Sequence, residues 1–516
     1  MTAEAGTPEA ETPEAVTPEA VTAVPTVPGE PTTARAGRRS PPRPGRRFLL
    51  VLGLVVVAAA GVRAVNVLVW RPTCTEDFLA VVATAQAGGE VERPGPGCYQ
   101  VVNDALYHHM QGRLLAEGHG FVDGATWFFE SLAGDDARMR ASAGDPPLYA
   151  SFLAALSVLG FETVTGQRLA TGVAGALGVG IIGLVGRRVA GERAGLLAAA
   201  LGAIYPMLWI NDGMLLSEGL YAPLCAGVVL AAYRWWDRPD LGRAAVLGLL
   251  LGLASLTRAE ALALVVLLLV PLGWGLRRRV GTRRAAGGVA LAGGVAVLSI
   301  VPWLAYNLGR FEEPVFMTSG TGSVLSAGAC DATFGGPLLG YYANCFDQYV
   351  ADGTVEGWPD PVTLDEAQRD AVSRDGAVRY LRDHLDELPR VVPARIGRMW
   401  DLYRPVQNVD LNWQIEDRDR WASEAGFAMY ALLAPFAIGG AVVLWRRRLP
   451  ISPLLAFPAA VTLTAAATFG VTRYRVPGDV SLVILAAVSI EALLRRGVGP
   501  STTGLTTRRG DREVVG

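Results

Sequence analysis

Long runs of apolar residues, separated by short polar or arginine-rich segments, make up most of the chain. The hydrocarbon core of a bilayer is about 30 Å thick, and a helix that crosses it needs roughly 17–25 mostly apolar residues. About ten stretches meet or approach this length: residues 48–70, 168–186, 195–211, 214–233, 244–257, 261–276, 286–306, 427–445, 451–469 and 479–494. The pattern predicts an all-α polytopic membrane protein.

A further apolar stretch, residues 148–163, is short for a span and fits an interfacial or re-entrant helix better. Positive side chains gather on the cytoplasmic side of membrane proteins, so the arginine clusters test this interpretation. If 148–163 does not cross, the clusters share one side: Arg38, Arg39, Arg43, Arg46 and Arg47, Arg187 and Arg188, Arg234 and Arg238, Arg277 to Arg279, Arg446 to Arg448, and Arg495 and Arg496. We therefore expect a multi-pass plasma-membrane protein with both termini in the cytoplasm. We expect the first apolar stretch to be retained as an anchor, since it is long for a signal peptide and lacks a small-residue cleavage site.

The remaining segments differ strongly in character. The N-terminal segment repeats TPEA and holds almost no large apolar side chains, which predicts a disordered tail. The expected units in chain order are a cytoplasmic tail at 1–47, a membrane module at 48–306 with an outer loop at 71–147 and the interfacial helix 148–163, an outer domain at 307–426, membrane helices at 427–496 and a second disordered tail at 497–516.

Composition narrows the class of protein further. Of the 516 residues, 51% are hydrophobic and 18% are charged, whereas a soluble protein carries about 25% charged residues. This excludes an ordinary cytosolic enzyme, a fibre and a disordered protein. The net charge of −2 gives no indication of a nucleic-acid partner.

The five cysteines indicate which segments lie in an oxidising compartment. Cys74 and Cys98 share the first outer loop, and Cys330 and Cys345 share the second. Two pairs confined to outer loops predict two disulfides, Cys74–Cys98 and Cys330–Cys345. Four free thiols are the alternative, and a zinc site is disfavoured because no CxxC spacing occurs.

Ionisable residues near the outer membrane face are costly to place there and therefore informative. Asp104 stands where a helix is expected to begin, so that it is either a helix N-cap or a functional carboxylate. His108 and His109 follow on the same helix and could be metal ligands, although adjacent histidines face different ways and are more often surface or packing residues. Asp145, before Pro146 and Pro147, could simply cap the interfacial helix.

A second set of charged residues lies at the predicted outer ends of later spans. Asp212 falls in a tight turn, and Glu218 lies about one turn into a span, where it needs a cation, a proton or a buried arginine. Arg258, Glu260, Arg473 and Arg475 lie at other helix mouths. Arginines retained on the outer side indicate an anion to bind, and a guanidinium binds phosphate in bidentate fashion. A purely structural ion-pair network is the alternative.

The order of short motifs along residues 48 to 496 resembles the GT-C glycosyltransferases of family 39 type, which include dolichyl-phosphate-mannose protein mannosyltransferases and lipid A aminoarabinose transferases. The motifs are Asp104 and Tyr107 followed by LAEGHGF at 115–121, PPLY at 146–149, RL at 168–169 with GRR at 186–188, LSE at 216–218, LTRAE at 256–260 and PW at 302–303 followed by Asn307. One departure is that Asp145 stands where the family often has a histidine, which puts that residue's metal or phosphate role in doubt.

The resemblance implies a GT-C helix bundle and inverting transfer of a sugar from a polyprenyl-phosphate donor to an extracytoplasmic protein, glycan or lipid. It implies Asp104 as the base and makes Arg258, Arg473 and Arg475 candidates for binding the donor phosphate. Asp212, Glu218, Glu260, His108 and Asp145 would support them or hold a divalent ion such as Mg²⁺ or Mn²⁺. The outer domain would select the acceptor. A lipid-linked sugar transporter (flippase) and a non-catalytic membrane scaffold are the rival functions.

Overall fold

The chain folds almost entirely into α-helices in a computed structural model that describes residues 44–89, 97–134, 137–357 and 363–497. Within these ranges the only β-type pairings are two isolated bridges, Thr73 with Tyr99 and Val122 with Ala141. Most of the predicted tails, residues 1–43 and 498–516, lies outside the described residues. Arg46 and Arg47, which we assigned to the N-terminal tail, instead open the first helix.

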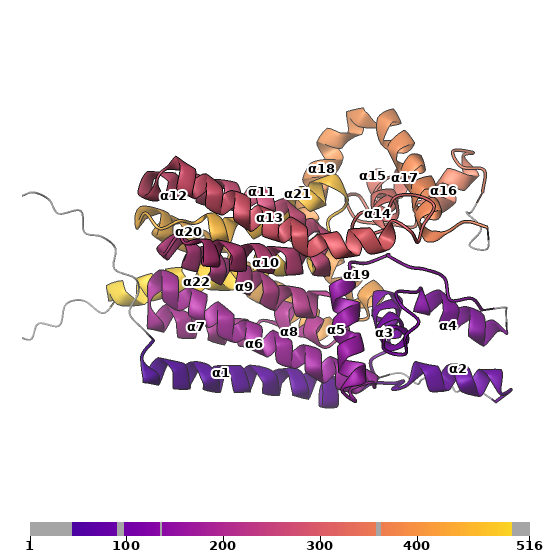
Figure 1. The fold of residues 1–516 in the computed structure, drawn as a ribbon, viewed down its shortest axis with the longest axis horizontal. Helices are drawn as coiled ribbons and strands as arrows, with labels where there is room; N and C mark the ends of the chain where they lie inside the picture. Colours follow the sequence, from indigo (N-terminus) through magenta and orange to yellow (C-terminus); the bar gives the residue numbers. More distant parts are fainter. Residues whose placement is uncertain (1–43, 90–96, 135–136, 358–362, 498–516) are drawn as a thin grey trace, which may run out of the picture. The chain divides into compact units, whose positions relative to one another are not determined.

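Each predicted span corresponds to one helix or to a pair or group of consecutive helices (Figure 1). They are α1 (Arg46–Val65) with η1 (Asn66–Trp70), α6 (Val164–Ala190), α7 (Glu192–Ile204) with α8 (Pro206–Asp212), α9 (Glu218–Asp237), α10 (Leu241–Thr257), η2 (Ala259–Leu262) with α11 (Ala263–Leu267) and α12 (Leu269–Val280), α13 (Thr282–Asn307), α20 (Arg420–Arg446), α21 (Ser452–Ala467), and η4 (Thr472–Arg475) with α22 (Val476–Gly497). Among the described residues, six spans are long and apolar enough to cross a membrane, or seven with the bent pair α7–α8. The chain is a multi-pass membrane protein, and the count of ten spans stays a prediction.

The helices of the bundle run side by side in Figure 1, with α6 packed against α1, α7 and α9, and α22 packed against α7, α20 and α21. Between α7 and α8 the chain bends by 56° at Tyr205 and Pro206. Pro206 has no backbone N–H to donate, so it can begin a helix but cannot continue the preceding one. The bend places Asn211 and Asp212 in a buried position at the end of α8.

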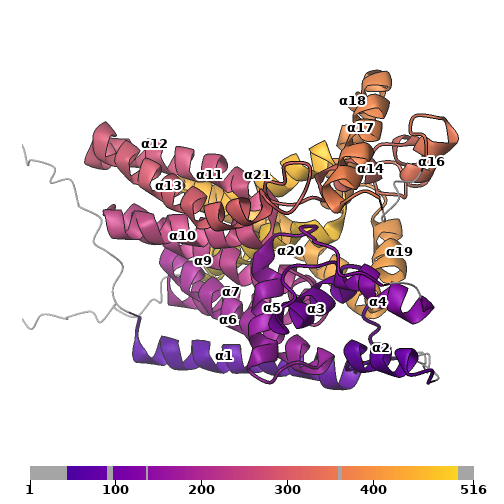
Figure 2. The same ribbon diagram turned by 45° about the vertical axis from the view of Figure 1, so that its right-hand side comes forward.

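A short helix, α5 (Pro147–Val158), runs across the others rather than along them in both ribbon views (Figures 1 and 2). Its twelve residues are only about 18 Å long at 1.5 Å per residue, which is too short to cross a bilayer. It contacts α3, α6 and α10. This arrangement agrees with the interfacial helix expected at 148–163.

Two groups of shorter helices extend beyond the bundle. The first holds α2 (Phe78–Gln86), α3 (Asn103–Ala116) and α4 (Gly124–Ala133). The second holds α14 (Thr321–Ala327), α15 (Asp331–Phe334), α16 (Phe346–Ala351), α17 (Glu366–Asp383), η3 (Leu385–Glu387), α18 (Leu388–Met399) and α19 (Pro405–Glu416). Part of the second group packs on an aromatic core of its own around Phe334, Phe346, Tyr349 and Tyr380.

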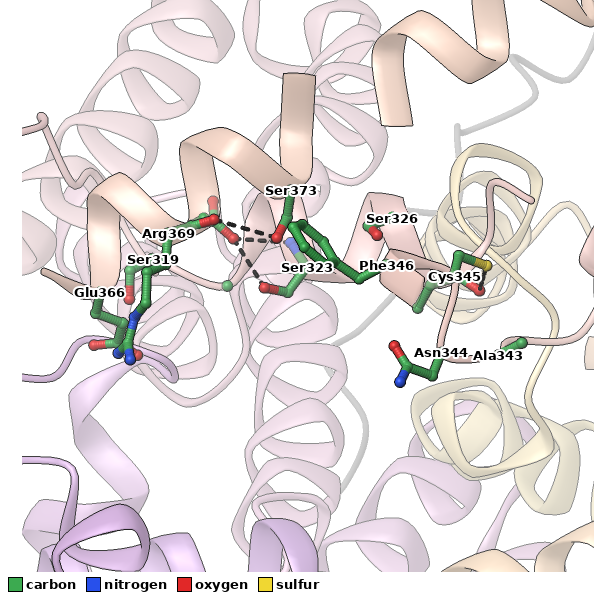
Figure 3. A pocket seen from close by; sticks show the side chains of 13 residues that line it. Ser319, Ser323, Ser326, Ala343, Asn344, Cys345, Phe346, Glu366, Arg369 and Ser373 are labelled. Atoms are coloured by element: carbon green, nitrogen blue, oxygen red, sulfur yellow. Dashed lines mark hydrogen bonds between the residues drawn. The ribbon is translucent and has the colours of Figure 1, made fainter. Parts of the chain in front are cut away.

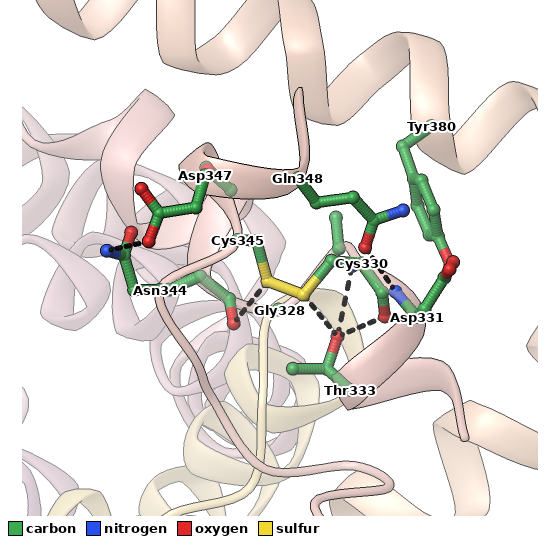
Figure 4. Close-up of a disulfide and its surroundings, with 12 residues drawn as sticks. Gly328, Cys330, Asp331, Thr333, Asn344, Cys345, Asp347, Gln348 and Tyr380 are labelled. Carbon is green, nitrogen blue, oxygen red and sulfur yellow. Dashed lines mark hydrogen bonds between the residues drawn. A yellow bond between two sulfur atoms is a disulfide. The ribbon is translucent and has the colours of Figure 1, made fainter. Parts of the chain in front are cut away.

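Both predicted disulfides are present, Cys74–Cys98 in the first group and Cys330–Cys345 in the second. In Figure 4 the second bond joins the start of α15 to the start of α16, and Thr333 fixes the turn beside it. The Thr333 hydroxyl donates to the Cys330 carbonyl at 3.0 Å and accepts from the Cys330 N–H at 3.1 Å. Cys225 is buried as a free thiol in α9.

A buried ion pair joins α1 to α8 inside the bundle. Arg63 Nε lies 2.5 Å from Asp212 Oδ2, and both side chains are almost completely buried. Gly175 on α6 makes room for this pair, because a Cβ atom at that position would lie 2.0 Å from Asp212 Oδ2. Asp212 therefore pairs with Arg63, and the expectation that it orients Arg258, Arg473 or Arg475 was wrong.

We expect Gly175→Ala to destabilise the bundle by about 1–3 kcal/mol, because the added methyl group must displace a buried carboxylate. The measurement is the midpoint of thermal unfolding in detergent. Gly287→Ala in α13 is the matched control, since nothing lies within 4 Å of a Cβ atom placed there. Equal midpoints for the two variants would show that the space at Gly175 is not needed.

Candidate functional site

Arg473 is the centre of a cluster of charged side chains at one end of the bundle. It lies in η4, directly before α22, and its guanidinium donates to three carboxylates from separate elements. Nη2 lies 2.7 Å from Asp104 on α3, and Nε lies 2.7 Å from Glu218 at the start of α9. Nη1 lies 3.0 Å from Glu416, the last residue of α19. One side chain thus joins four elements that are far apart in the sequence.

Arg258 extends the cluster on the side of the bundle. It caps the C-terminus of α10 in an extended conformation, which directs the chain away from the helix. Its Nη1 lies 2.8 Å from Glu218 Oε1, and its Nε pairs with Glu260. Glu218 therefore binds both Arg258 and Arg473. These two cations compensate the buried carboxylate, as the sequence requires for a charge at that depth. The guanidinium of Arg258 also lies 4.7 Å from the ring centre of Tyr474.

Asp104 differs from its neighbours in exposure. Its side chain is 48% exposed, whereas those of Arg473 and Glu218 are 8% and 1% exposed. It lines a cavity of about 20 Å³ together with Tyr99 and Glu416, which leaves room for about one water molecule. Burial opposes ionisation of the Asp104 carboxyl, but the charges of Arg473 and His108 outweigh it and lower its pKa. Asp104 is thus an ionised carboxylate that faces solvent beside a buried arginine network.

Asp104 does not cap α3, the alternative that its position left open. The N-cap of α3 is Val102, and no side chain caps that end. Asn103 takes a left-handed conformation with φ of 50°, which asparagine tolerates better than most residues. The turn at Asn103 directs the Asp104 carboxylate to Arg473 instead of to the helix backbone.

The two histidines of α3 lie in different environments, and both are buried rather than on the surface. His108 Nε2 lies 3.7 Å from the half-exposed carboxylate of Asp145. The N-cap of α5 is Pro146, and no side chain makes a capping hydrogen bond at that end, so Asp145 is not a helix cap. Its carboxylate faces His108 instead. His109 Nδ1 lies 2.8 Å from Gln167 Oε1, and burial lowers the pKa of His109 to about 4, which keeps it neutral.

Arg475 lies outside the Arg473 cluster although only one residue separates the two. Its side chain is completely buried, with Nη1 2.8 Å from Asp401 and Nε 3.1 Å from Asp479. Its guanidinium also lies 3.7 Å from the ring centre of Tyr430. All these partners are structural, so the structural alternative describes Arg475 better than the phosphate-binding role.

The carboxylates and histidine proposed for a divalent ion do not form a coordination set. In the parts of the chain that the structure describes, no group of three or more His, Cys, Asp or Glu side chains is placed to hold a metal. Glu218 and Glu260 are bound to Arg258, and Asp212 is bound to Arg63. We therefore derive no catalytic step through Mg²⁺ or Mn²⁺.

Glu366, at the start of α17, ties the outer domain to the segment that precedes Asp145. Its carboxylate accepts from the backbone N–H of Ala143 at 2.8 Å and from the Ser142 hydroxyl at 3.3 Å. The Ser142 hydroxyl also lies 2.7 Å from the Tyr107 hydroxyl on α3. Burial raises the pKa of Glu366 to about 7. Neither Glu366 nor Glu416 was identified from the sequence, because their partners lie in distant segments that only tertiary packing brings close.

Residues 144–306 match the family model described as dolichyl-phosphate-mannose-protein mannosyltransferase, which confirms the resemblance that the motifs indicate. The match includes Asp145, Glu218, Arg258 and Glu260, and it relates the chain to membrane glycosyltransferases. Asp104 and Arg473 lie outside the matched residues. No curated protein matches the sequence.

Two solved structures show a detectable but low similarity to this chain. The oligosaccharyltransferase AglB from Archaeoglobus fulgidus, in complex with an inhibitory peptide and a dolichol-phosphate, is 13% identical with a TM-score of 0.49, and the match covers 89% of this chain and 52% of that one. ArnT from Cupriavidus metallidurans, bound to undecaprenyl phosphate, is 16% identical with a TM-score of 0.35, and the match covers 80% and 77% of the two chains. The chain thus spans about half the length of the archaeal enzyme.

We expect stability to depend on pH through Glu366. A carboxyl with a raised folded-state pKa favours the folded state most below its unfolded pKa of about 4.3, and this contribution is lost as pH rises to about 7. Glu366→Gln should therefore flatten the fall of the thermal midpoint between about pH 5 and about pH 7. Glu387→Gln in η3 is the control. Parallel midpoint curves for wild type and Glu366→Gln would contradict this expectation.

We expect Arg475→Met to cost about 3–5 kcal/mol of stability, because it leaves Asp401 and Asp479 buried without a cation. Arg420→Met, at the start of α20, removes a pair with Glu424 in which both side chains are 56% exposed, and should cost less than about 1 kcal/mol. Thermal unfolding of both variants in detergent measures the difference. A loss of sugar transfer by Arg475→Met at unchanged stability would instead return this residue to the functional site.

Proposed function

We propose that the chain transfers a sugar from a polyprenyl-phosphate donor to an extracytoplasmic acceptor, with inversion at the anomeric carbon and Asp104 as the base. The observation that carries the proposal is the half-exposed Asp104 carboxylate held 2.7 Å from the buried guanidinium of Arg473. A general base must contact the hydroxyl of an acceptor that arrives from solvent. The phosphate that leaves from the donor needs a fixed positive charge beside it. The cluster offers both in one place.

The position of the cluster supports an extracytoplasmic site. Arg473 precedes α22, and Arg495 and Arg496 lie in the last turn of that helix. The 22 residues of α22 are about 33 Å long, close to the thickness of the hydrocarbon core. In Figure 1 the first turn of α1 and the last turns of α6, α12 and α22, which carry arginines, lie at the opposite end of the bundle from α3. By the positive-inside rule, the arginine-rich end is cytoplasmic and the Arg473 cluster faces outward.

In the proposed reaction, the acceptor hydroxyl attacks the anomeric carbon and gives its proton to Asp104. The bond between that carbon and the phosphate oxygen breaks, and polyprenyl phosphate leaves with the electron pair. Such a displacement passes through an oxocarbenium-like state, which a base on one face and charge neutralisation on the other both stabilise. Arg473 and Arg258 supply the neutralising charge.

Both guanidiniums are already paired with carboxylates, so the donor phosphate must compete for them. Asp104 is the most exposed of the three carboxylates that contact Arg473. Its carboxylate can therefore move away from Arg473 into solvent without leaving an unpaired charge inside the protein. Once phosphate replaces it, Asp104 loses its nearest cation and becomes a stronger base. Glu218 and Glu260 would keep the arginines in position. Donor binding would thereby activate the base.

We expect Asp104→Asn to reduce transfer by about 10²–10⁴-fold, the usual contribution of a general base, while leaving the fold intact. The assay uses membrane vesicles with a radiolabelled hexosyl or pentosyl polyprenyl phosphate and measures label in the acceptor fraction. Glu117→Gln is the matched control, because Glu117 ends the same helix and its side chain is 43% exposed. Wild-type transfer by Asp104→Asn would remove this residue from the chemistry.

The same vesicles separate the rival functions. Label that enters an acceptor indicates a transferase, whereas label that only crosses the bilayer indicates a flippase. Vesicles in which neither occurs would support a scaffold.

A further inference from the structure

A second site lies in the outer domain, outside the Arg473 cluster. It is a pocket of about 490 Å³ between α14, the loop before α16 and the first half of α17 (Figure 3). This volume lies within the range of small-molecule sites, roughly 300–1,000 Å³. Polar side chains form much of its wall, among them Ser319, Ser323, Ser326, Asn344, Asp370 and Ser373. We refer to it as the serine pocket.

Ser319 gives the first indication of a ligand. Its side chain is buried, with 4% exposure of the residue, and its hydroxyl makes no hydrogen bond. It interacts with the Glu366 carboxylate and lowers the pKa of that group, against the larger effect of burial. Because this contact lacks good hydrogen-bond geometry, a ligand that donates or accepts at Ser319 would make a stronger bond there.

The other polar groups are fixed and offer both donors and acceptors. The Asp370 carboxylate is held by the backbone N–H groups of Gly322 and Ser323, each at 2.8 Å. Gly322 allows α14 to approach α17 this closely, because a Cβ atom there would lie 2.0 Å from the Asp370 carbonyl. Phe346 adds an aromatic side chain to the wall. Hydrogen bonds to the backbone thus already orient the Asp370 carboxylate in the pocket wall.

The charges of the pocket indicate a neutral ligand. Among its lining residues the carboxylates of Glu366 and Asp370 outnumber the single guanidinium, that of Arg369. Glu366, with a pKa of about 7, is partly neutral, so the pocket has no net positive charge with which to hold a phosphate or another anion. A ligand with many hydroxyl groups fits better, since each hydroxyl both donates and accepts.

The serine pocket adjoins the segment that leads into the proposed active site. Glu366 bonds to Ala143, and a Cβ atom at Gly320 would lie 3.1 Å from the Gly144 carbonyl oxygen. Ser142 in turn contacts Tyr107, one turn after Asp104 on α3. A ligand in the pocket therefore lies beside the backbone that positions Asp145 and α3.

We infer that the serine pocket binds a neutral sugar unit of the acceptor and holds it while a neighbouring unit reaches Asp104. The inference rests on the proposed function, since it makes the acceptor a glycan. Peptide and lipid acceptors are the competing outcomes. The aromatic ring of Phe346, the buried Ser319 hydroxyl and the lack of net positive charge all favour a carbohydrate over an anionic headgroup.

The experiment measures binding without requiring transfer. Full-length protein in detergent is mixed with the methyl glycosides of mannose, glucose, galactose and arabinose, and with a threonine-rich peptide, and saturation-transfer NMR reports which probes bind. Ser373→Trp fills the pocket from α17. Asp375→Trp is its matched control, because Asp375 lies two residues further on the same helix and its side chain is 72% exposed. Asn344→Ala removes an exposed polar group of the wall at little risk to folding.

At least one glycoside should bind wild type and Asp375→Trp, and Ser373→Trp should weaken this binding by about tenfold or more. Asn344→Ala should weaken it in the same direction. Asp104→Asn should keep glycoside binding while it loses transfer, which separates this inference from the proposed function. Binding of the peptide alone, binding of no glycoside, or unchanged binding by Ser373→Trp and Asn344→Ala would overturn it.

Discussion

The whole site depends on one guanidinium that satisfies three carboxylates. Arg473 carries a single positive charge, yet Asp104, Glu218 and Glu416 all lie within 3.0 Å of its nitrogens. Three negative charges around one positive charge repel one another, and Arg258, which pairs with Glu218, relieves part of this repulsion. Of the three carboxylates, Asp104 is the most exposed and is therefore the one that can move away from Arg473 most easily. A lysine could not replace Arg473, because a compact ammonium lacks the planar fork that reaches three partners.

The bundle holds two kinds of charged group, and their exposure to solvent distinguishes structural ion pairs from the candidate site. Arg63 with Asp212, and Arg475 with Asp401 and Asp479, are closed pairs in which every charged side chain is buried. Each such pair fixes the register between helices, and breaking one strands a charge inside the protein. The Arg473 cluster instead opens to solvent at Asp104. Exposure at one edge, rather than the presence of charge, distinguishes the candidate site.

Much of the fold was predictable from the sequence because a bilayer imposes a simple length rule. Runs of about 20 apolar residues identified the helices, the short run at 148–163 identified the transverse helix α5, and the placement of cysteines identified both disulfides. Asp104, Glu218, Arg258, Glu260 and Arg473 were also identified by their depth.

The ion-pair partners of these residues were not predictable in the same way. Arg473 and Arg475 are two residues apart in a tight 3₁₀ turn, so they point to different neighbours. Glu416 and Glu366 reach the site from elements whose placement depends on tertiary packing.

Both disulfides join cysteines that are close in the sequence, with separations of 24 and 15 residues. Each covalent link lies within one outer segment, and none connects the segments to each other. Each bond can thus form once the residues of its own loop have been synthesised, before later helices are complete. The two outer segments are joined instead by reversible contacts such as that between Glu366 and Ala143. Each disulfide therefore constrains its own segment alone, whereas non-covalent contacts set how the two segments lie against each other.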